Sequence, residues 1–141
     1  MRFWDSSALL TLSAGQPDAP VLQPVLDEDP KMALWWGTRV EMVSGACRLW
    51  RENQFDEAGF LDLLAGIDET CREAAEIDPS EPLREQAIRL AKAHELRAGD
   101  ALQLAAALAW ADHKPSGMGF VCLDKRLRAA AVKEGFTVVP P

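Results

Sequence analysis

The sequence predicts an α/β fold in which a mostly parallel central sheet is flanked by helices. Short apolar runs alternate along the chain with longer segments that carry apolar residues at helical spacing. The segment 99–111 is apolar on almost every side, which is typical of a buried helix. Strands that alternate with helices form parallel sheets covered on both faces. The length of 141 residues suits one domain, and we assign residues 1–141 to a single domain.

The expected elements follow in order from local pattern. We expect strands at five short apolar segments, residues 1–4, 31–36, 73–77, 119–123 and 137–139. We expect helices at seven segments of helical periodicity, residues 6–13, 19–28, 38–52, 55–69, 81–94, 99–111 and 124–134.

Turn and capping residues separate these elements. Gly15-Gln16-Pro17 ends the first helix, and Gly37 ends the second strand. The third and fourth helices follow each other closely, so we expect a helical hairpin. Ser80 is a favourable N-cap for the fifth helix, and Pro140-Pro141 stops the last strand.

Composition excludes several classes of protein. No apolar run approaches the roughly 20 residues of a membrane span. The net charge of −7 argues against a broad basic face, so any contact with nucleic acid must be local. Cys47, Cys71 and Cys122 lack the paired spacing of a disulfide framework or a zinc site. We therefore expect a cytoplasmic protein without a membrane segment, in which the cysteines are small core residues.

Four acidic residues occupy one kind of position. Asp5 follows the first strand, and Glu41 lies in the first turn of the third helix. Asp100 opens the buried helix, and Asp124 follows the fourth strand. Because ligands of open parallel sheets bind outside the carboxyl ends of the strands, these four acids are expected to face one crevice.

Each acid also has a structural interpretation. Asp5 and Asp124 are suited to cap helices. Two pairs resemble capping boxes, Thr38 with Glu41 and Asp100 with Gln103. Capping does not explain why the most buried helix opens with an acid that must lose its water.

Converging carboxylates require a counter-charge. Two carboxylates about 5 Å apart repel by roughly 3 kcal/mol at an effective dielectric near 20. An all-oxygen ligand set selects Mg²⁺ or Mn²⁺ over zinc. Such an ion activates water and neutralises the charge that develops on a leaving oxygen. The predicted chemistry is therefore hydrolysis of phosphate esters.

Four segments resemble the successive motifs of PIN domains, particularly the VapC toxins. They are FWDSSALL (3–10), TRVE (38–41), LRAGDALQLAAA (96–107) and FVCLDKRL (120–127). The resemblance extends from the first residues to the tail at 135–139 and is weakest between residues 56 and 82.

The resemblance implies a PIN-like domain with Mg²⁺- or Mn²⁺-dependent endoribonuclease activity on RNA. It implies that Asp5, Glu41, Asp100 and Asp124 are the catalytic, metal-binding acids. It also implies the toxin of a type II toxin–antitoxin pair, a homodimer held inactive by an antitoxin whose C-terminal segment covers the site. Cys122 stands where the family often has Ser or Thr. Lys125-Arg126 stands where a further acid often follows, and these departures weaken the case for a second metal ion.

Other polar residues are candidates for supporting roles. Ser6 and Ser7 are placed to orient an acid or a water, or simply to cap a helix. Arg97, Lys125 and Arg126 are candidate substrate contacts, because phosphate positioning needs cations near an acidic pocket. The wider set of basic candidates adds Arg39, Arg48 and Arg128. Solvated surface charge is the alternative interpretation of all of them.

Two other functions compete with the nuclease. A PIN-like fold that no longer holds metal would serve as a protein-interaction module, which Cys122 favours and the four acids oppose. A phospho-acceptor signalling domain would need two adjacent acids after the first strand, where this chain has only Asp5. Neither histidine has a partner at nucleophile or metal spacing, and no glycine-rich phosphate loop is present.

Overall fold

The computed structural model describes residues 1–141. The strands are β1 (Arg2–Trp4), β2 (Met32–Trp35), β3 (Ala75–Ile77), β4 (Gly119–Val121) and β5 (Thr137–Val139). The helices are α1 (Ser6–Ser13), α2 (Ala19–Glu28), α3 (Thr38–Arg51), α4 (Glu57–Glu73), α5 (Glu81–His94), α6 (Ala98–Trp110) and α7 (Lys125–Glu134). None of the helices combines the length and apolar character that crossing a bilayer requires.

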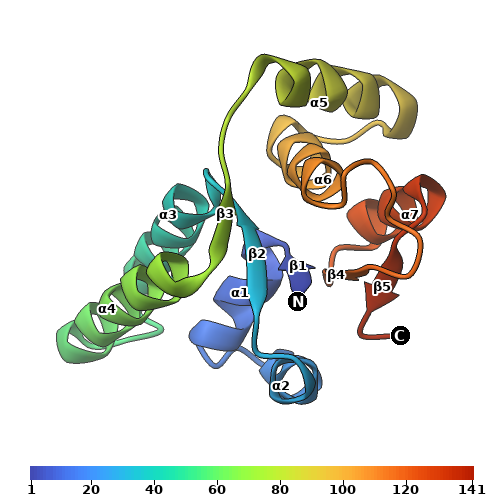
Figure 1. The fold of residues 1–141 in the computed structure, drawn as a ribbon. Helices are drawn as coiled ribbons and strands as arrows, with labels where there is room; N and C mark the ends of the chain where they lie inside the picture. The colour runs from blue at the N-terminus through green and yellow to red at the C-terminus, as the bar shows by residue number, and fades with distance from the viewer.

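The strands form one sheet in the order β3-β2-β1-β4-β5, and every neighbouring pair is parallel (Figure 1). The predicted α/β architecture, with a parallel central sheet flanked by helices, is confirmed. The sheet is parallel throughout because each connection between consecutive strands of the sequence contains at least one helix and returns the chain to the same end of the sheet.

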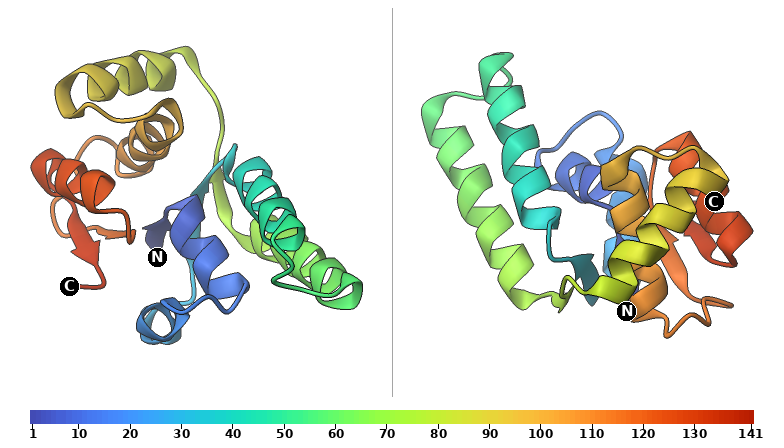
Figure 2. Two further views of the ribbon diagram at one scale, coloured as in Figure 1. Left: turned by 180° about the vertical axis from the view of Figure 1, so that it is seen from behind. Right: turned by 90° about the horizontal axis from the view of Figure 1, so that it is seen from above.

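Alternate strand residues point to opposite faces and divide the core in two. Phe3 and Phe120 belong to the layer under α5, α6 and α7, and their rings stack with centroids 5.6 Å apart. Trp4 and Val121, the next residue on each strand, pack with α1 to α4 on the other face. The two helical layers are visible on either side of the strands in Figures 1 and 2.

Helix α6 is the buried helix that the sequence predicts. From position 101 to 108 only Leu102 is not fully buried, because the helix lies between the sheet, α5 and α7. Helices α3 and α4 form the expected hairpin, which extends away from the sheet in Figure 2. Trp50 of α3 stacks on Phe60 of α4 with ring centroids 4.3 Å apart.

The boundary between α4 and β3 differs from the expectation. Helix α4 continues to Glu73, four residues past the expected end at 69, and β3 begins only at Ala75. The helix continues because Ile67 and Cys71 extend its buried face by one more turn. The strand that remains has exposed residues at positions 75 and 76 and forms an edge of the sheet.

The topology creates a crevice beside β1. From the central strand β1 the chain moves to β2 and β3 on one side, and after α5 and α6 it enters β4 on the other side. The strand order therefore reverses between β1 and β4. In open α/β sheets this switch point, at the carboxyl ends of the strands, is where ligands bind.

Candidate functional site

Asp5 lies directly at the switch point. Its backbone N–H donates to Val121 O at 3.0 Å, which ties the end of β1 to the end of β4. Its carboxylate caps α1 by accepting from the backbone N–H of Ser7, and it also accepts from the Ser7 hydroxyl. The residue is only 2% exposed. The N-cap interpretation of Asp5 is therefore correct, and the capped carboxylate is almost completely buried.

Glu41 is held by three helices. It lies in the first turn of α3, and its Oε2 accepts from Ser6 Oγ of α1. Gln103 Nε2 of α6 donates to the same oxygen at 3.2 Å and to Thr38 Oγ1 at 3.1 Å. Thr38 and Gln103 are both buried. These neutral donors fix the position of the Glu41 carboxylate beneath the carboxyl end of β1.

The predicted capping boxes are wrong. Helix α3 has Gly37 at its N-cap and α6 has Arg97, and neither helix end has a side-chain capping bond. The Thr38 hydroxyl accepts from Gln103 instead of capping α3. Gln103 turns toward Glu41 of another helix, because it lies fully buried in a helix whose other buried residues are apolar.

The last two acids lie at the starts of α6 and α7. Asp100 is half-buried in the first turn of α6. Asp124 is exposed and caps α7 by accepting from the backbone N–H of Leu127 at 2.8 Å, so its N-cap interpretation is correct. Asp100 is repelled by the negative charges of both Asp124 and Glu41, so it interacts with acids on two different helices.

The electrostatics of this cluster are unfavourable without a counter-ion. Burial, opposed by the Ser7 hydrogen bond and reinforced by the nearby charges of Asp100 and Glu41, raises the pKa of Asp5 to about 6. Burial, followed by Asp124 and Glu41, likewise raises the pKa of Asp100, although Arg97 and Arg126 oppose the rise. None of the four acids forms an ion pair with a basic side chain.

The type of ligand atom in this cluster suits a hard divalent cation, but the side chains are not positioned to coordinate one. The ligand atoms are carboxylate oxygens without basic partners, which is the set that Mg²⁺ and Mn²⁺ prefer. The side-chain amide of Gln103 adds a buried oxygen, Oε1, that has no hydrogen-bond partner. However, no three His, Cys, Asp or Glu side chains are grouped closely enough here to hold a metal ion. A ligand set therefore requires rotation of side chains such as Glu41 or Asp100.

A pocket of about 540 Å³ opens over part of the cluster. Its lining includes Ser6, Ser7, Glu41 and Asp100 at one end and continues along α3. Asp5 is not part of the lining, since it is buried beneath the surface, and Asp124 lies outside the pocket. The structure thus places Glu41 and Asp100 in the lining of one pocket, with the Asp5 carboxylate buried behind Ser7 of that lining and Asp124 outside the pocket.

The predicted supporting residues fall into two groups. Ser6 and Ser7 donate hydrogen bonds to the carboxylates of Glu41 and Asp5, so both touch the acidic cluster. Arg97, Lys125 and Arg126 are exposed at the starts of α6 and α7. The Arg126 guanidinium donates to the backbone oxygen of Glu95 at 3.3 Å, whereas the other two side chains make no hydrogen bond or ion pair.

Cys122 lies beneath the cluster. It is fully buried at the end of β4, and its thiol contacts the backbone oxygen of Asp124 at 3.8 Å. Burial, together with the charge of Asp5, raises the pKa of this thiol well above its usual range. Of the three cysteines, Cys71 is also buried and Cys47 is half-buried. The thiol of Cys122 therefore stays neutral and acts as a core group.

Sequence reasoning missed several residues of the site. Gln103 was assigned only to a capping box, although a glutamine among alanines and leucines in a buried helix signals a polar partner elsewhere. Ser44 and Arg51 were not singled out. A usable signal was present, since Glu41, Ser44, Arg48 and Arg51 recur at steps of three and four residues and therefore share one face of α3.

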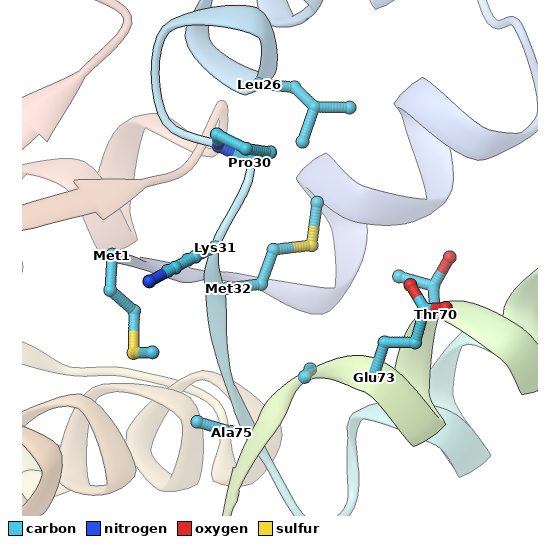
Figure 3. Close-up of a pocket in the computed structure, with 9 residues that line it drawn as sticks. Met1, Leu26, Pro30, Lys31, Met32, Thr70, Glu73 and Ala75 are labelled. Carbon is cyan, nitrogen blue, oxygen red and sulfur yellow. The ribbon is translucent and has the colours of Figure 1, made fainter.

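A larger hollow of about 680 Å³ lies at the opposite end of the sheet (Figure 3). Met1, Lys31, Met32 and Ala75 line it where β1, β2 and β3 begin. It contains one acid, Glu73, and no group of polar side chains directed at a common point. The acidic cluster therefore lies at the carboxyl ends of the strands and not in the larger hollow.

No protein-family model and no curated protein matches the sequence. Solved structures do match the fold. A chain of a toxin–antitoxin complex from Klebsiella pneumoniae has a TM-score of 0.69 at 17% identity, with 97% of both chains covered. PAE2754 from Pyrobaculum aerophilum has a TM-score of 0.65 at 20% identity over 98% of this chain and 88% of that one. FitAcB from Neisseria gonorrhoeae has a TM-score of 0.57 at 18% identity over 98% and 96%. At these identities the likeness establishes the fold.

Proposed function

We propose that this chain is a PIN-like, Mg²⁺- or Mn²⁺-dependent endoribonuclease that acts as the toxin of a toxin–antitoxin pair. One observation carries the proposal, namely the group of carboxylates without basic partners at the sheet's switch point, with one of them almost completely buried. The fold match to a chain of a toxin–antitoxin complex supports the same biology.

In this proposal Asp5, Glu41, Asp100 and Asp124 hold the ion. A bound Mg²⁺ or Mn²⁺ would supply positive charge at the scissile phosphate and favour ionisation of an attacking water. The chain's own residues prepare the ligands. Ser7 orients Asp5, while Ser6 and Gln103 orient the Glu41 carboxylate from two other helices. The buried position of Asp5 keeps bulk water away from the innermost ligand.

The proposed partner is an antitoxin that covers the pocket, and the proposed assembly is a homodimer in the cytoplasm. Trp36, which precedes α3, and Val40, in the first turn of α3, are 52% and 69% exposed, and Val40 lines the pocket. Large apolar side chains exposed beside a polar site are suited to a protein partner. The short gene next to this one should encode that antitoxin, and light scattering of the isolated chain tests the dimer.

Cleavage of a labelled single-stranded RNA with Mn²⁺, with Mg²⁺ and with EDTA tests the enzyme. Asp5→Asn and Asp100→Asn should each reduce cleavage by at least about 100-fold, because loss of even a group that orients a ligand reduces activity by about 10- to 100-fold. Asp62→Asn is the matched control, since Asp62 is an exposed acid on α4. Equal cleavage by all three variants would remove the proposed mechanism.

A protein-interaction module without metal is the competing function. The absence of three carboxylates grouped for a metal favours it. Calorimetric titration with Mn²⁺ separates the two functions. Binding that disappears in Asp5→Asn supports the enzyme, whereas no binding by the wild-type chain supports the module.

A further inference from the structure

The pocket at the acidic cluster continues along one face of α3. Its lining includes Glu41, Ser44, Arg48 and Arg51, which are three, four and three residues apart and so form a single stripe on the helix. At 1.5 Å of rise per residue, Arg48 lies about 10 Å and Arg51 about 15 Å along the axis from Glu41. One open pocket therefore joins an acidic end to a basic end.

These two arginines are unusual in this chain because they have no partner. Apart from Arg97, every other arginine binds a carboxylate or a backbone oxygen through its guanidinium group. These arginines are Arg2, Arg39, Arg72, Arg84, Arg89, Arg126 and Arg128. Arg48 and Arg51 make no hydrogen bond and no ion pair, although the chain carries 22 acidic residues against 15 basic ones. Two uncompensated positive charges thus line the same pocket as the acids.

The surface between the two ends is open. Ser44 and Gly45 form it, and a Cβ atom at Gly45 would lie 2.2 Å from Leu10 Cδ2. The glycine therefore allows the Leu10 side chain of α1 to pack directly against α3 beneath the pocket. Basic residues in a last helical turn also stabilise the helix dipole. Stabilisation of the helix dipole alone, however, does not explain why Arg48 and Arg51 line the same pocket as Glu41.

We propose that Arg48 and Arg51 form a phosphate-binding subsite for the backbone of single-stranded RNA. The subsite rests on the proposed nuclease function and deepens it. Guanidinium groups bind phosphate through paired N–H donors, and their distance from Glu41 means that they hold phosphates of neighbouring nucleotides and not the one that is cleaved. Backbone contacts of this kind fix the position and direction of a strand without reading its bases.

The test compares Arg48→Gln/Arg51→Gln with Arg72→Gln/Arg84→Gln. Both double variants remove two positive charges, but the control arginines lie on α4 and α5, outside the pocket. Binding of a fluorescent single-stranded oligoribonucleotide is measured with Ca²⁺ in place of Mg²⁺, and gels verify that the RNA stays intact. Circular dichroism and thermal melts verify folding.

The subsite variant should bind RNA about tenfold more weakly than the control. The slope of log affinity against log salt should fall in magnitude by about 1.4, because each phosphate that an arginine no longer neutralises reduces it by about 0.7. In cleavage with Mn²⁺, its KM should rise while kcat stays within about twofold, because the arginines bind substrate and transition state alike. Arg48→Lys/Arg51→Lys should recover most of the affinity.

Other results overturn the subsite. If the wild-type chain cleaves RNA, and the subsite variant and the control variant have the same KM and the same salt slope, the subsite is removed and the proposed nuclease function still stands. Unchanged RNA affinity together with abolished binding of a polyglutamate probe would assign the arginines to an acidic protein segment instead. A wild-type chain that neither binds nor cleaves RNA would overturn both the subsite and the nuclease. A wild-type chain that binds RNA without cleaving it, with weaker RNA binding in the subsite variant, would overturn the nuclease alone.

Discussion

Replacement of Asp5 by Asn should stabilise the fold while it abolishes activity. The Asp5 carboxylate is 2% exposed and has no basic partner. Asn has nearly the same shape, is also a good N-cap, and its amide oxygen can still accept from Ser7. The variant therefore removes a buried charge and keeps the cap.

The magnitude follows from the Asp5 pKa. Burial and the neighbouring acids, partly offset by the Ser7 hydrogen bond, raise that pKa from 3.8 to about 6, and about two pKa units at about 1.4 kcal/mol each correspond to about 3 kcal/mol. Between these two pH values the folded state binds more protons than the unfolded state. Stability from this group therefore falls as pH rises from about 4 to about 6, and the full loss applies above pH 6. Because the Asn amide must also be buried, we expect a net gain of about 1–2 kcal/mol at pH 7.5.

Thermal unfolding in EDTA measures this gain. An unfolding entropy of about 2.1 cal/mol/K per residue converts 1–2 kcal/mol into an increase in Tm of about 3–7 °C for a chain of this length. The difference between variant and wild type should shrink toward zero as the pH is lowered to about 4. Saturating Mn²⁺ should raise the Tm of the wild type and leave that of the variant unchanged.

A variant that melts at or below the wild-type temperature in EDTA at pH 7.5 would refute the reasoning. It would mean that the Asp5 charge is compensated within the protein. Asp62→Asn again serves as the control, because neutralising an exposed acid on α4 should change Tm by less than about 1 °C.

Two further perturbations address the hydrogen-bond networks. Gln103→Leu should leave RNA binding nearly unchanged and lower kcat by about tenfold, since it removes a donor that orients Glu41. Single-turnover cleavage with Mn²⁺ measures the change in rate. An unchanged rate would contradict the proposed role of Gln103. Glu134→Gln should destabilise the fold by about 1–3 kcal/mol, because the Glu134 carboxylate binds Arg89 at the end of α5 in two places and also His94 Nε2 at 2.7 Å. Urea unfolding measures the loss, and a midpoint equal to that of the wild type would show that the contacts are replaced by water.

Most of the fold was predictable because local signals agreed with the tertiary structure. Four of the five strands are short apolar runs and most helices begin or end at recognisable turn or capping residues, so the order of the elements follows from pattern alone. The end of α4 was not predictable. Glu73 sits beyond the last apolar residue of the helix, and only the packing of Cys71 against the core decides that the helix reaches it.

The site was predictable only at the level of strand ends. Asp5 and Asp124 follow strands, so topology alone places them near the switch point. The partners of Glu41 were not predictable from the sequence. The Thr38-x-x-Glu41 pattern fits a capping box within α3 and equally fits hydrogen bonds that both side chains accept from another helix. Only the burial of Gln103 beside α3 decides between them. The role of Arg48 and Arg51 depends on the shape of a pocket, which no linear pattern encodes.

The order of the elements also determines when the acidic cluster is completed during protein synthesis. Asp5 emerges first from the ribosome, whereas Asp100 and Asp124 are translated in the last third of the chain and enter the sheet region only with α6 and β4. A nascent or truncated chain therefore lacks half of the acidic cluster. The proposed nuclease site would therefore be complete only when synthesis of the chain is nearly finished, which would give the proposed antitoxin time to bind the newly folded product.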